Sequence, residues 1–445
     1  MTVIDEAALG QAMHDLAAEL FPITRSLTGP GYRATLDRLE RVSGPMLRHR
    51  FLSGERVHDW VVPPEWTIRD AWIKGPDGAI VVAVGDCNLH VVGYSTPVHA
   101  TLGLAELQEH LHSLPEQPAA IPYRTSYYTE NWGFCLADEQ RRTLPDGPYE
   151  VLIDADLAPG AVELGEVVIE GTSDGRSPAG AQGAAGEVLL WTYCCHPSLA
   201  NNELSGPVVA AHLAALLRER RPRHTYRIVF APETIGAIAY LSRFGERLRE
   251  RLVAGYVLTC AGDPGPFTYK RSRRGDSLAD RVAEHVLRCG EAPHGVLDFV
   301  AVGSDERQFC SPGYDLPVGS LMRTMYGTYP EYHTSLDDLE LITPAALGET
   351  LGAYVRIVDA LEANETLVGT VLYGEPQLGR RGLYPATGGP SAALSAGHQR
   401  DIMFLLNFCD GTADLLAAAE ASGRPLAELA EAADLLRAND LLRPA

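Results

Sequence analysis

The second half of the chain alternates strand-like with helix-like segments, and this alternation restricts the possible folds more than any other feature. The strand-like runs are apolar at nearly every position, which is typical of strands covered on both faces of a sheet. In chain order the segments are strand 187–194, helix 203–220, strand 225–232, helix 234–249, strand 254–260, helix 277–289 and, after shorter apolar runs, helix 343–363. Strands separated by helices of this length predict a mixed, mostly parallel sheet with helices on both faces.

Residues 51–184 have a different pattern of apolar and turn-forming residues. Short strand-like runs are separated there by Gly, Pro and Asp-Gly turns, which predicts a β-rich unit. Two amphipathic helices are expected before it, at 8–21 and 32–42. We therefore expect one α/β domain, built from 1–50 and 185–368, with a β-rich domain inserted at 51–184.

The end of the chain forms a separate unit in this interpretation. A Gly- and Pro-rich stretch at 379–397 precedes three short helix-like segments, and we assign a winged-helix domain to 369–445. Its third helix carries Glu428, Glu431 and Asp434, and an acidic helix is poorly suited to lie against phosphates. We expect this domain to pack or to contact a partner rather than to bind DNA.

Charge and composition limit the partners. The chain has 37 Lys and Arg against 58 Asp and Glu, a formal net charge of −21, which repels nucleic acid and anionic membrane surfaces. The first residues do not resemble a secretory signal, no apolar run reaches membrane-spanning length, and the eight cysteines are scattered. These features predict a cytoplasmic protein with reduced thiols and no membrane or nucleic-acid partner. The oligomeric state stays open, a homo-oligomer included.

The stretch 191–206 is the first candidate site. It takes the chain from a strand into a polar turn that contains His196, Asn201 and Asn202 and then into a helix. Ligands of open α/β sheets bind at the carboxyl ends of the strands, and a helix amino terminus lies here as well. A metal or anion site is one interpretation, and a histidine that merely caps the turn is the other.

Three later segments repeat this plan. Glu233 ends the next strand, Asp263 follows the one after it in an Asp-Pro-Gly turn, and His333 lies in a loop before the long helix. Two histidines and an acid at sheet ends suit zinc with an open position for water, and a glutamate beside it suits a general base. A helix-capping glutamate and an ordinary Asp-Pro-Gly turn are the alternatives.

These residues occur in an order that resembles the zinc aminopeptidase superfamily, which includes glutamate carboxypeptidase and bacterial leucyl aminopeptidases. Within it, the chain is most similar to bacterial aminopeptidase-like proteins that are often encoded among polysaccharide or secondary-metabolite genes. The resemblance covers most of the chain. It depends on the strings Cys-His-Pro-Ser-Leu-Ala-Asn, Gly-Ser-Asp-Glu-Arg-Gln-Phe-Cys-Ser-Pro-Gly and Tyr-Pro-Glu-Tyr-His-Thr-Ser.

The resemblance implies a site around zinc. His196 and His333 match zinc ligands, Asp263 matches an acidic ligand, Glu233 matches the general base, and Asp305 matches an aspartate near the site.

Two positions depart from the peptidase pattern. Asn202, followed by Glu203, stands where peptidases have the aspartate that bridges two metals, and Thr234 stands where they have a second glutamate ligand. Neutral oxygens balance two cations poorly. We therefore expect one zinc ion, or a shifted ligand set that includes Asn202 and Glu203.

The activity implied is zinc-dependent hydrolysis of an amide bond in a peptide or a small biosynthetic intermediate. Arg323 or Tyr329 would stabilise the oxyanion or a substrate carboxylate. Arg271 belongs to the densest basic run and binds either an anionic substrate or the protein's own acids, and Tyr128 either lines the site or packs between domains. The competing hypothesis is a degenerate peptidase fold that binds a ligand or partner without hydrolysis.

Overall fold

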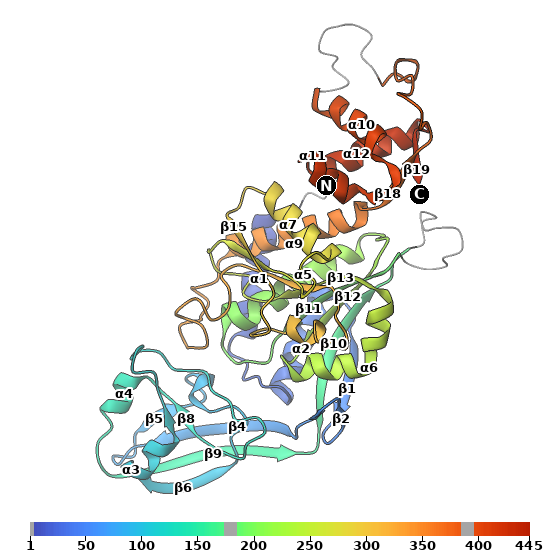
Figure 1. Ribbon diagram of the computed structural model, residues 1–445. Helices are drawn as coiled ribbons and strands as arrows, with labels where there is room; N and C mark the ends of the chain where they lie inside the picture. Colours follow the sequence, from blue (N-terminus) through green and yellow to red (C-terminus); the bar gives the residue numbers. More distant parts are fainter. Residues whose placement is uncertain (1–3, 173–184, 384–395) are drawn as a thin grey trace.

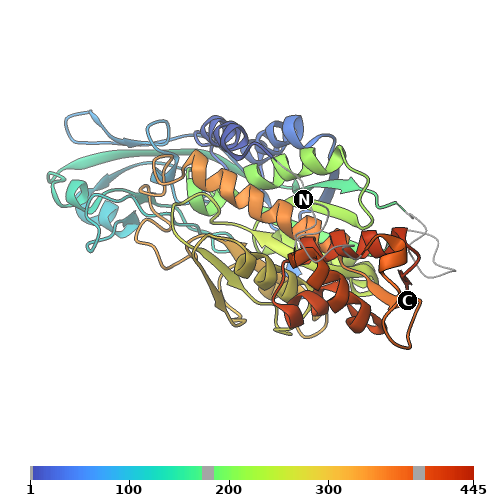
Figure 2. The same ribbon diagram turned by 90° about the horizontal axis from the view of Figure 1, so that it is seen from above.

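The computed structural model describes residues 4–172, 185–383 and 396–445, which form three parts in a row (Figure 1). A central α/β part lies between a β-rich insertion and a small C-terminal part. The view from above shows the same order, with the insertion and the C-terminal part at opposite ends (Figure 2). No helix among the described residues is long and apolar enough to cross a bilayer.

The central part is built on an eight-stranded sheet in the order β1-β10-β12-β11-β13-β16-β14-β15. The strands are β1 Leu47–Leu52, β10 Ala161–Ile169, β11 Glu187–Tyr193, β12 Thr225–Ala231, β13 Leu252–Leu258, β14 Phe267–Lys270, β15 His294–Leu297 and β16 Val318–Met322. The four strands β12, β11, β13 and β16 are parallel, whereas β10 and β14 run antiparallel beside them. Every residue of β11 and β12 is buried, as expected for strands that are covered on both faces.

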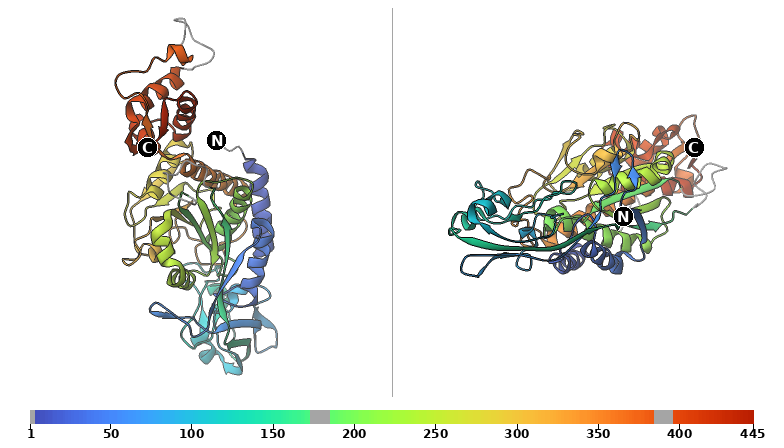
Figure 3. Two further views of the ribbon diagram at one scale, coloured as in Figure 1. Left: turned by 90° about the vertical axis from the view of Figure 1, so that its right-hand side faces the viewer. Right: turned by 90° about the horizontal axis from the view of Figure 1, so that it is seen from below.

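Helices cover both faces of this sheet. One layer contains α1 Glu6–Leu20, α2 Pro30–Ser43, α5 Ser205–Arg218, α7 Leu278–Cys289 and α9 Pro344–Ala363, and α6 Ile235–Arg251 packs with the short α8 Glu306–Phe309. Figure 3 shows α1 and α2, in blue, along one side of the molecule. Gly10 allows the helices α1 and α9 to approach closely. A Cβ at this position would lie 2.0 Å from the Pro344 carbonyl oxygen.

The insertion contains a four-stranded sheet in the order β5-β4-β9-β6 and a hairpin, β2-β3. Its main strands are β2 Arg56–Val57, β3 Trp60–Val61, β4 Glu65–Lys74, β5 Ile80–Ala83, β6 Val98–Gly103 and β9 Pro148–Ala158; short elements are η1 Asn88–His90, α3 Leu104–Leu107, η2 Gln108–His110, β7 Leu111–His112, β8 Phe134–Cys135 and α4 Asp138–Arg142.

The expected bounds of the insertion, 51–184, need correction. The expected bounds include β10, which pairs with β1 and β12 in the central sheet, so the inserted residues are those between β1 and β10, 53–160. β10 carries Glu163 and Glu166 among its apolar residues. Because charged residues are unusual in a buried strand, the sequence pattern did not predict one here. Residues 173–184, at the end of the expected insertion, lie outside the described residues.

The C-terminal part combines helices with a three-stranded sheet, β18-β17-β19. Its elements are β17 Thr366–Gly369, η4 Gly379–Arg381, α10 Ala396–Phe408, β18 Asp410–Asp414, α11 Leu415–Ser422, α12 Leu426–Ala438 and β19 Leu442–Pro444. Arg281 of α7 pairs with Asp414 and Glu420, and the backbone N–H of Leu426 donates to His285 Nε2 at 2.9 Å. These contacts fasten this part to the central part.

Candidate functional site

The carboxyl ends of the parallel strands deliver the residues of the candidate site. His196 follows β11, Glu233 follows β12, and Cys260 follows β13. Because β11 has β12 and β13 as its two neighbours, the three ends lie side by side at one edge of the sheet. This is the edge at which open α/β sheets bind their ligands.

The two predicted histidines meet at this edge. The ring centroids of His196 and His333 lie 5.3 Å apart, with the ring planes tilted by 35°. Tyr123 from the insertion packs against both rings, at 4.4 and 5.3 Å, and its backbone N–H donates to the His333 carbonyl oxygen at 2.8 Å. Two imidazoles bound to one zinc ion at ~2.1 Å would have centroids roughly 5–6 Å apart, so the observed separation is compatible with a shared ion.

Glu203 and Arg25 hold His196 from two sides. Glu203 Oε2 accepts a hydrogen bond from the His196 backbone N–H at 2.9 Å, and its Oε1 atom forms an ion pair with Nδ1. Nε of Arg25 donates to the His196 carbonyl oxygen at 3.1 Å. Both charged side chains are buried. Burial lowers the pKa of His196, but the Glu203 carboxylate opposes this, and the pKa is raised overall.

Glu233 lies on the other side of the His196 ring, with Oε2 at 3.8 Å from Nε2. Its side chain keeps 23% of its surface exposed, whereas that of His196 keeps 4%, so Glu233 is open to a substrate. Burial raises the pKa of Glu233 to about 8; His196 opposes the increase, and the negative charges of Asp305 and Glu203 add to it.

The turn after Glu233 is held by a buried network. Thr234 has a positive φ of 62°, and its backbone N–H donates to Asp305 Oδ1 at 2.8 Å. Asp305 Oδ2 accepts from the indole of Trp191 at 2.7 Å, and Arg307 donates to the Thr234 hydroxyl at 2.9 Å. Asp305, expected near the site, therefore positions the strand-to-helix turn that carries Glu233.

Two buried polar atoms of the cluster lack a hydrogen-bond partner among the described residues. They are Asn202 Oδ1 and His333 Nε2. Buried polar atoms are normally satisfied, so orphans that gather at one place indicate a missing group. Oxygen and imidazole nitrogen are the donors that zinc prefers outside thiolate sites. His196 and His333 thus supply nitrogen donors that fit a zinc ion, and the Glu203 carboxylate lies against Nδ1 and the backbone N–H of His196.

Cys195 is a further group beside His196 and Glu203. Its Sγ, a nitrogen of His196 and a carboxylate oxygen of Glu203 all lie within 4.8 Å of one another. Burial raises the pKa of this thiol well above its usual range, and the Glu233 backbone N–H donates to the sulfur at 3.3 Å. Without metal Cys195 is a protonated packing residue.

The structure gives Asp263 a different role from the predicted metal ligand. Its carboxylate accepts hydrogen bonds from Asn201 Nδ2 at 3.0 Å, Gly265 N at 2.8 Å, Thr324 N at 3.1 Å and the Thr324 hydroxyl at 2.5 Å. A carboxylate with both oxygens satisfied by such donors is not free to hold a cation. Asp263 instead ties the turn after β13 to the segment after β16.

Asp337 holds the turn that contains Asn201 and Asn202. This role was not predicted. Its oxygens accept from the backbone N–H groups of Asn201 at 2.6 Å and Asn202 at 3.0 Å, in the π-helical turn Ala200–Leu204, η3. Tyr329 donates to Asp337 at 3.4 Å. The predicted oxyanion group Tyr329 therefore reaches the support of the Asn202 turn. Asp337 lies four residues after His333 and two residues beyond the Tyr-Pro-Glu-Tyr-His-Thr-Ser motif, and this proximity in sequence was the available signal.

Three other predicted substrate contacts are engaged elsewhere. Arg323 pairs with Glu349 of α9 at 2.8 Å and stacks over the Phe267 ring at 4.6 Å. All three guanidinium nitrogens of Arg271 bind Glu284 or Asp298. Tyr128 packs edge-on against Trp60, and its hydroxyl donates to the Val61 carbonyl oxygen at 3.1 Å. Arg323 needs a different assignment, Arg271 follows the alternative in which it binds the protein's own acids, and Tyr128 packs within the insertion. A sequence does not show which opposite charge or ring will lie beside a side chain.

The mixed sheet, with its histidines and glutamates at the carboxyl edge of the parallel strands, places the chain in the class of aminopeptidase-like α/β folds. The chain belongs to the family described as "Domain of unknown function (DUF4910)", which matches residues 14–364, and a winged helix-turn-helix matches residues 365–444.

A curated relative from Clostridium acetobutylicum is 42% identical over 435 residues, which cover 98% of this chain and 96% of the relative. It is named "Putative polysaccharide biosynthesis protein with aminopeptidase-like domain". A crystal structure of a "putative peptidase" from the same organism matches with a TM-score of 0.90 and 39% identity, covering 99% of this chain and 98% of that one.

More distant structures share the fold alone. The zinc aminopeptidase BSAP from Bacillus subtilis matches with a TM-score of 0.59 and 11% identity, over 81% of this chain and 96% of that chain. A peptidase M28 precursor from Shewanella amazonensis matches with a TM-score of 0.53 and 13% identity, over 79% and 94%.

Proposed function

We propose that this protein is a metal-dependent hydrolase that cleaves an amide bond in a peptide or a small biosynthetic intermediate. The observation that carries the proposal is the meeting of His196, His333, Glu203 and Glu233 at one sheet edge, with an orphaned buried donor atom among them. The aminopeptidase-like domain in the relative's name supports the reaction class, and its mention of polysaccharide biosynthesis supports a substrate from a biosynthetic pathway.

His196 and His333 would hold the zinc ion in this proposal, with the Glu203 carboxylate against Nδ1 of His196. Zinc supplies a Lewis acid at the scissile carbonyl and lowers the pKa of water bound to it. The Glu203 carboxylate and the Arg25 guanidinium keep the His196 backbone in place. This agrees with the general finding that groups around a metal ligand fix its orientation.

Glu233 would act as the general base. It takes a proton from the attacking water and delivers it to the leaving nitrogen. It suits this role because it is the partly exposed carboxylate of the cluster and lies across the His196 ring from Glu203. Asp305 and Arg307 hold the following residue, Thr234, from both its backbone and its hydroxyl. A base held in this way loses little freedom when the substrate binds.

The second candidate is a binding protein that has lost hydrolysis. Asn202 and Thr234 are neutral where the peptidase pattern has carboxylates, and the Asp263 carboxylate is saturated with hydrogen bonds. Fewer anionic ligands lower the affinity for a divalent ion. This candidate expects a folded protein without resident metal.

One experiment separates the two candidates. Zinc is measured on protein purified without chelator, and wild type and Glu233→Gln are compared on a panel of aminoacyl and N-acyl amides. Zinc in both proteins, with turnover only in wild type, supports the hydrolase. A folded wild-type protein that contains no zinc and gains no activity when zinc is added supports the binding protein.

A further inference from the structure

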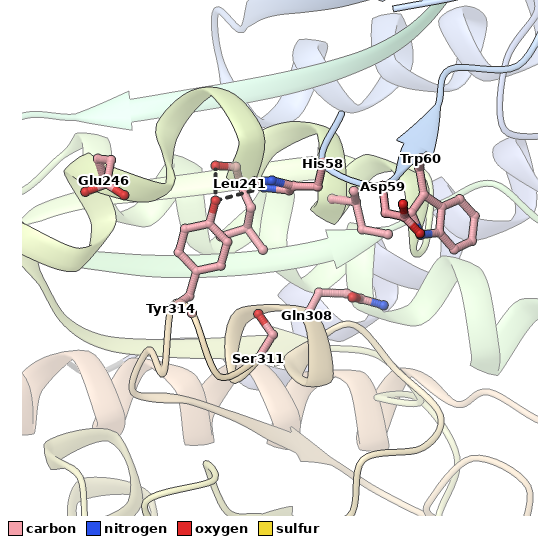
Figure 4. A pocket seen from close by; sticks show the side chains of 10 residues that line it. His58, Asp59, Trp60, Leu241, Glu246, Gln308, Ser311 and Tyr314 are labelled. Carbon is pink, nitrogen blue, oxygen red and sulfur yellow. Dashed lines mark hydrogen bonds between the residues drawn. The ribbon is translucent and has the colours of Figure 1, made fainter. Parts of the chain in front are cut away.

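A second concave site lies next to the turn that carries Glu233. It is a groove of about 460 Å³ between the hairpin β2-β3, helix α6 and the segment after α8 (Figure 4). Its lining includes Asp59 and Trp60 of the hairpin, Ile238, Leu241 and Glu246 of α6, and Tyr314 after α8. This volume is within the range of small-molecule sites.

Two of the elements that line the groove, α6 and α8, begin directly after Thr234 and Asp305, two residues of the network that holds the Glu233 turn. Ile238 lies one turn into α6, and its backbone N–H donates to the Thr234 carbonyl oxygen at 3.0 Å. Gln308 lies in α8, and its N–H donates to the Asp305 carbonyl oxygen at 2.8 Å. One helical turn is about 5.4 Å, so a ligand in the groove lies within a short reach of the Glu233 turn.

Specific contacts hold the hairpin over α6. The Tyr314 hydroxyl donates its single proton to the Leu241 carbonyl oxygen at 2.9 Å and must therefore accept from His58 Nε2 at 2.8 Å. Both contacts are visible as dashed lines in Figure 4. His58 has a positive φ of 54°, and a Cβ on Gly245 would lie 2.2 Å from the Tyr314 ring. The groove is thus a built feature of the fold.

The lining of the groove is aromatic and acidic. Trp60 is 39% exposed and stands edge-on to Tyr128, with centroids 5.7 Å apart. Asp59 and Glu246 supply carboxylates, and no Lys or Arg is among the described residues that line the groove. Two exposed arginines outside the lining pair with these acids, Arg56 at 3.9 Å from Asp59 and Arg249 at 3.3 Å from Glu246. Exposed pairs of this kind contribute little and exchange readily.

The aromatic and acidic lining of the groove favours a positively charged ligand. Carboxylates without a lining cation repel a phosphate or carboxylate ligand. An indole face beside carboxylates attracts a protonated amine through cation–π and charge interactions. The apolar floor of Ile238 and Leu241 suits the carbon skeleton that bears the amine.

We propose that this groove binds the amine-bearing part of the substrate, such as an amino sugar or a basic amino-acid residue. Its role as a substrate subsite rests on the proposed hydrolase function, whereas binding of an amine does not. The groove would position a substrate by its protonated amine, with the scissile amide directed toward Glu233.

The test is titration calorimetry on the full-length Glu233→Gln protein, in which turnover cannot consume the probe. The probes are the glucosamine disaccharide and the dipeptide Lys-Ala, each compared with its N-acetylated form, at low and high salt. Trp60→Leu and Asp59→Asn are expected to weaken amine binding about two- to fivefold each, and high salt is expected to weaken it further. The stronger probe identifies the source of the amine.

The matched control is Glu116→Gln, which removes an exposed acid that does not line the groove and should leave binding unchanged. Equal binding of the acetylated probes, insensitivity to both groove variants, or no binding of either amine would overturn the proposal. A protein that binds amines in the groove but hydrolyses no amide would refute the proposed function and leave the binding site standing.

Discussion

Arg25 and Glu203 hold opposite ends of the same main-chain unit, because Arg25 donates to the carbonyl oxygen of His196 at 3.1 Å and Glu203 accepts from its N–H at 2.9 Å. Arg25 lies in the connection between α1 and α2, and Glu203 lies in the π-helical turn after β11. A cation and an anion, both buried, therefore fix the position of the first candidate metal ligand. The N-terminal helices complete this site as well as covering the sheet.

We expect Arg25→Gln to weaken zinc binding and to destabilise the fold by about 1.5–3 kcal/mol, the range for a hydrogen bond that involves a charged group. The variant loses the charge that faces the His196 carbonyl. Zinc affinity by competition with a chromophoric chelator and urea unfolding of the metal-free protein measure the two effects separately. Arg25→Lys keeps the charge and should recover part of the zinc affinity; equal affinity of Gln and wild-type proteins would contradict the role of Arg25.

We expect about one zinc ion per chain, with loss of the ion in both His196→Ala and His333→Ala. A ligand that binds only the folded state stabilises it by about 2.7 kcal/mol at a hundred times its Kd, so removal of zinc by a chelator should lower Tm and readdition should restore it. Metal analysis by mass spectrometry and calorimetry measure both. Two zinc ions per chain, or an unchanged zinc content in His333→Ala, would refute the single-ion site.

Asp263→Asn distinguishes a loop-holding carboxylate from a metal ligand. The variant keeps the size of the side chain but replaces one acceptor oxygen by a donor that faces other donors, so we expect a loss of about 1–3 kcal/mol in unfolding free energy. Zinc content at saturating zinc should stay the same. If Asp263→Asn binds no zinc while it remains folded at low temperature, Asp263 is a ligand after all.

A buried charge network away from the site predicts an acid-sensitive fold. Glu166 accepts from Arg227 at 2.6 Å and from Tyr240 at 2.8 Å, and pairs with His49 at 2.6 Å. Burial alone would raise the pKa of Glu166, but the hydrogen bonds from His49 and Arg227 lower it overall from 4.5. A carboxyl with a depressed pKa contributes stability above its unfolded pKa and loses it as the pH falls through the folded value.

Glu166→Gln should therefore be about 3–5 kcal/mol less stable than wild type near pH 7, because it leaves Arg227 partly unpaired in a buried position. The difference should shrink as the pH falls below about 4.5, because wild type then loses the same charge. Urea unfolding between pH 3 and pH 7 gives the comparison, and Glu116→Gln serves as the exposed control. A difference that does not depend on pH would rule out a contribution from the ionised carboxylate.

The local features of the candidate site could be predicted from the sequence. His196 and Glu233 each follow a run of apolar, β-prone residues and precede a helix, so neighbours in the chain place both at strand ends. His333 was found through its motif. The departures at Asn202 and Thr234 were also visible, and the structure makes Asn202 Oδ1 an orphaned atom and the Thr234 hydroxyl a partner of Arg307.

Other assignments failed where a distant partner decides the role of a side chain. Asp263 was expected beside the metal, but Thr324, from the segment after a different strand, takes up its carboxylate. Arg323 was expected at the substrate and instead pairs with Glu349 of α9. β10 was missed because its buried Glu166 pairs with Arg227 on the neighbouring strand, and nothing near β10 in the chain predicts that partner.

Periodicity and turn chemistry are properties of residues that are close in sequence, so the α/β class and the polar residues at the strand ends follow from the sequence alone. The meeting of His196 with His333, and their joint contact with Tyr123 of the insertion, depends on the order of strands in the sheet and on the path of long connections. Only the folded chain brings these segments together. The burial created by that packing also shifts the pKa of Glu233 and leaves two donor atoms of the cluster without partners.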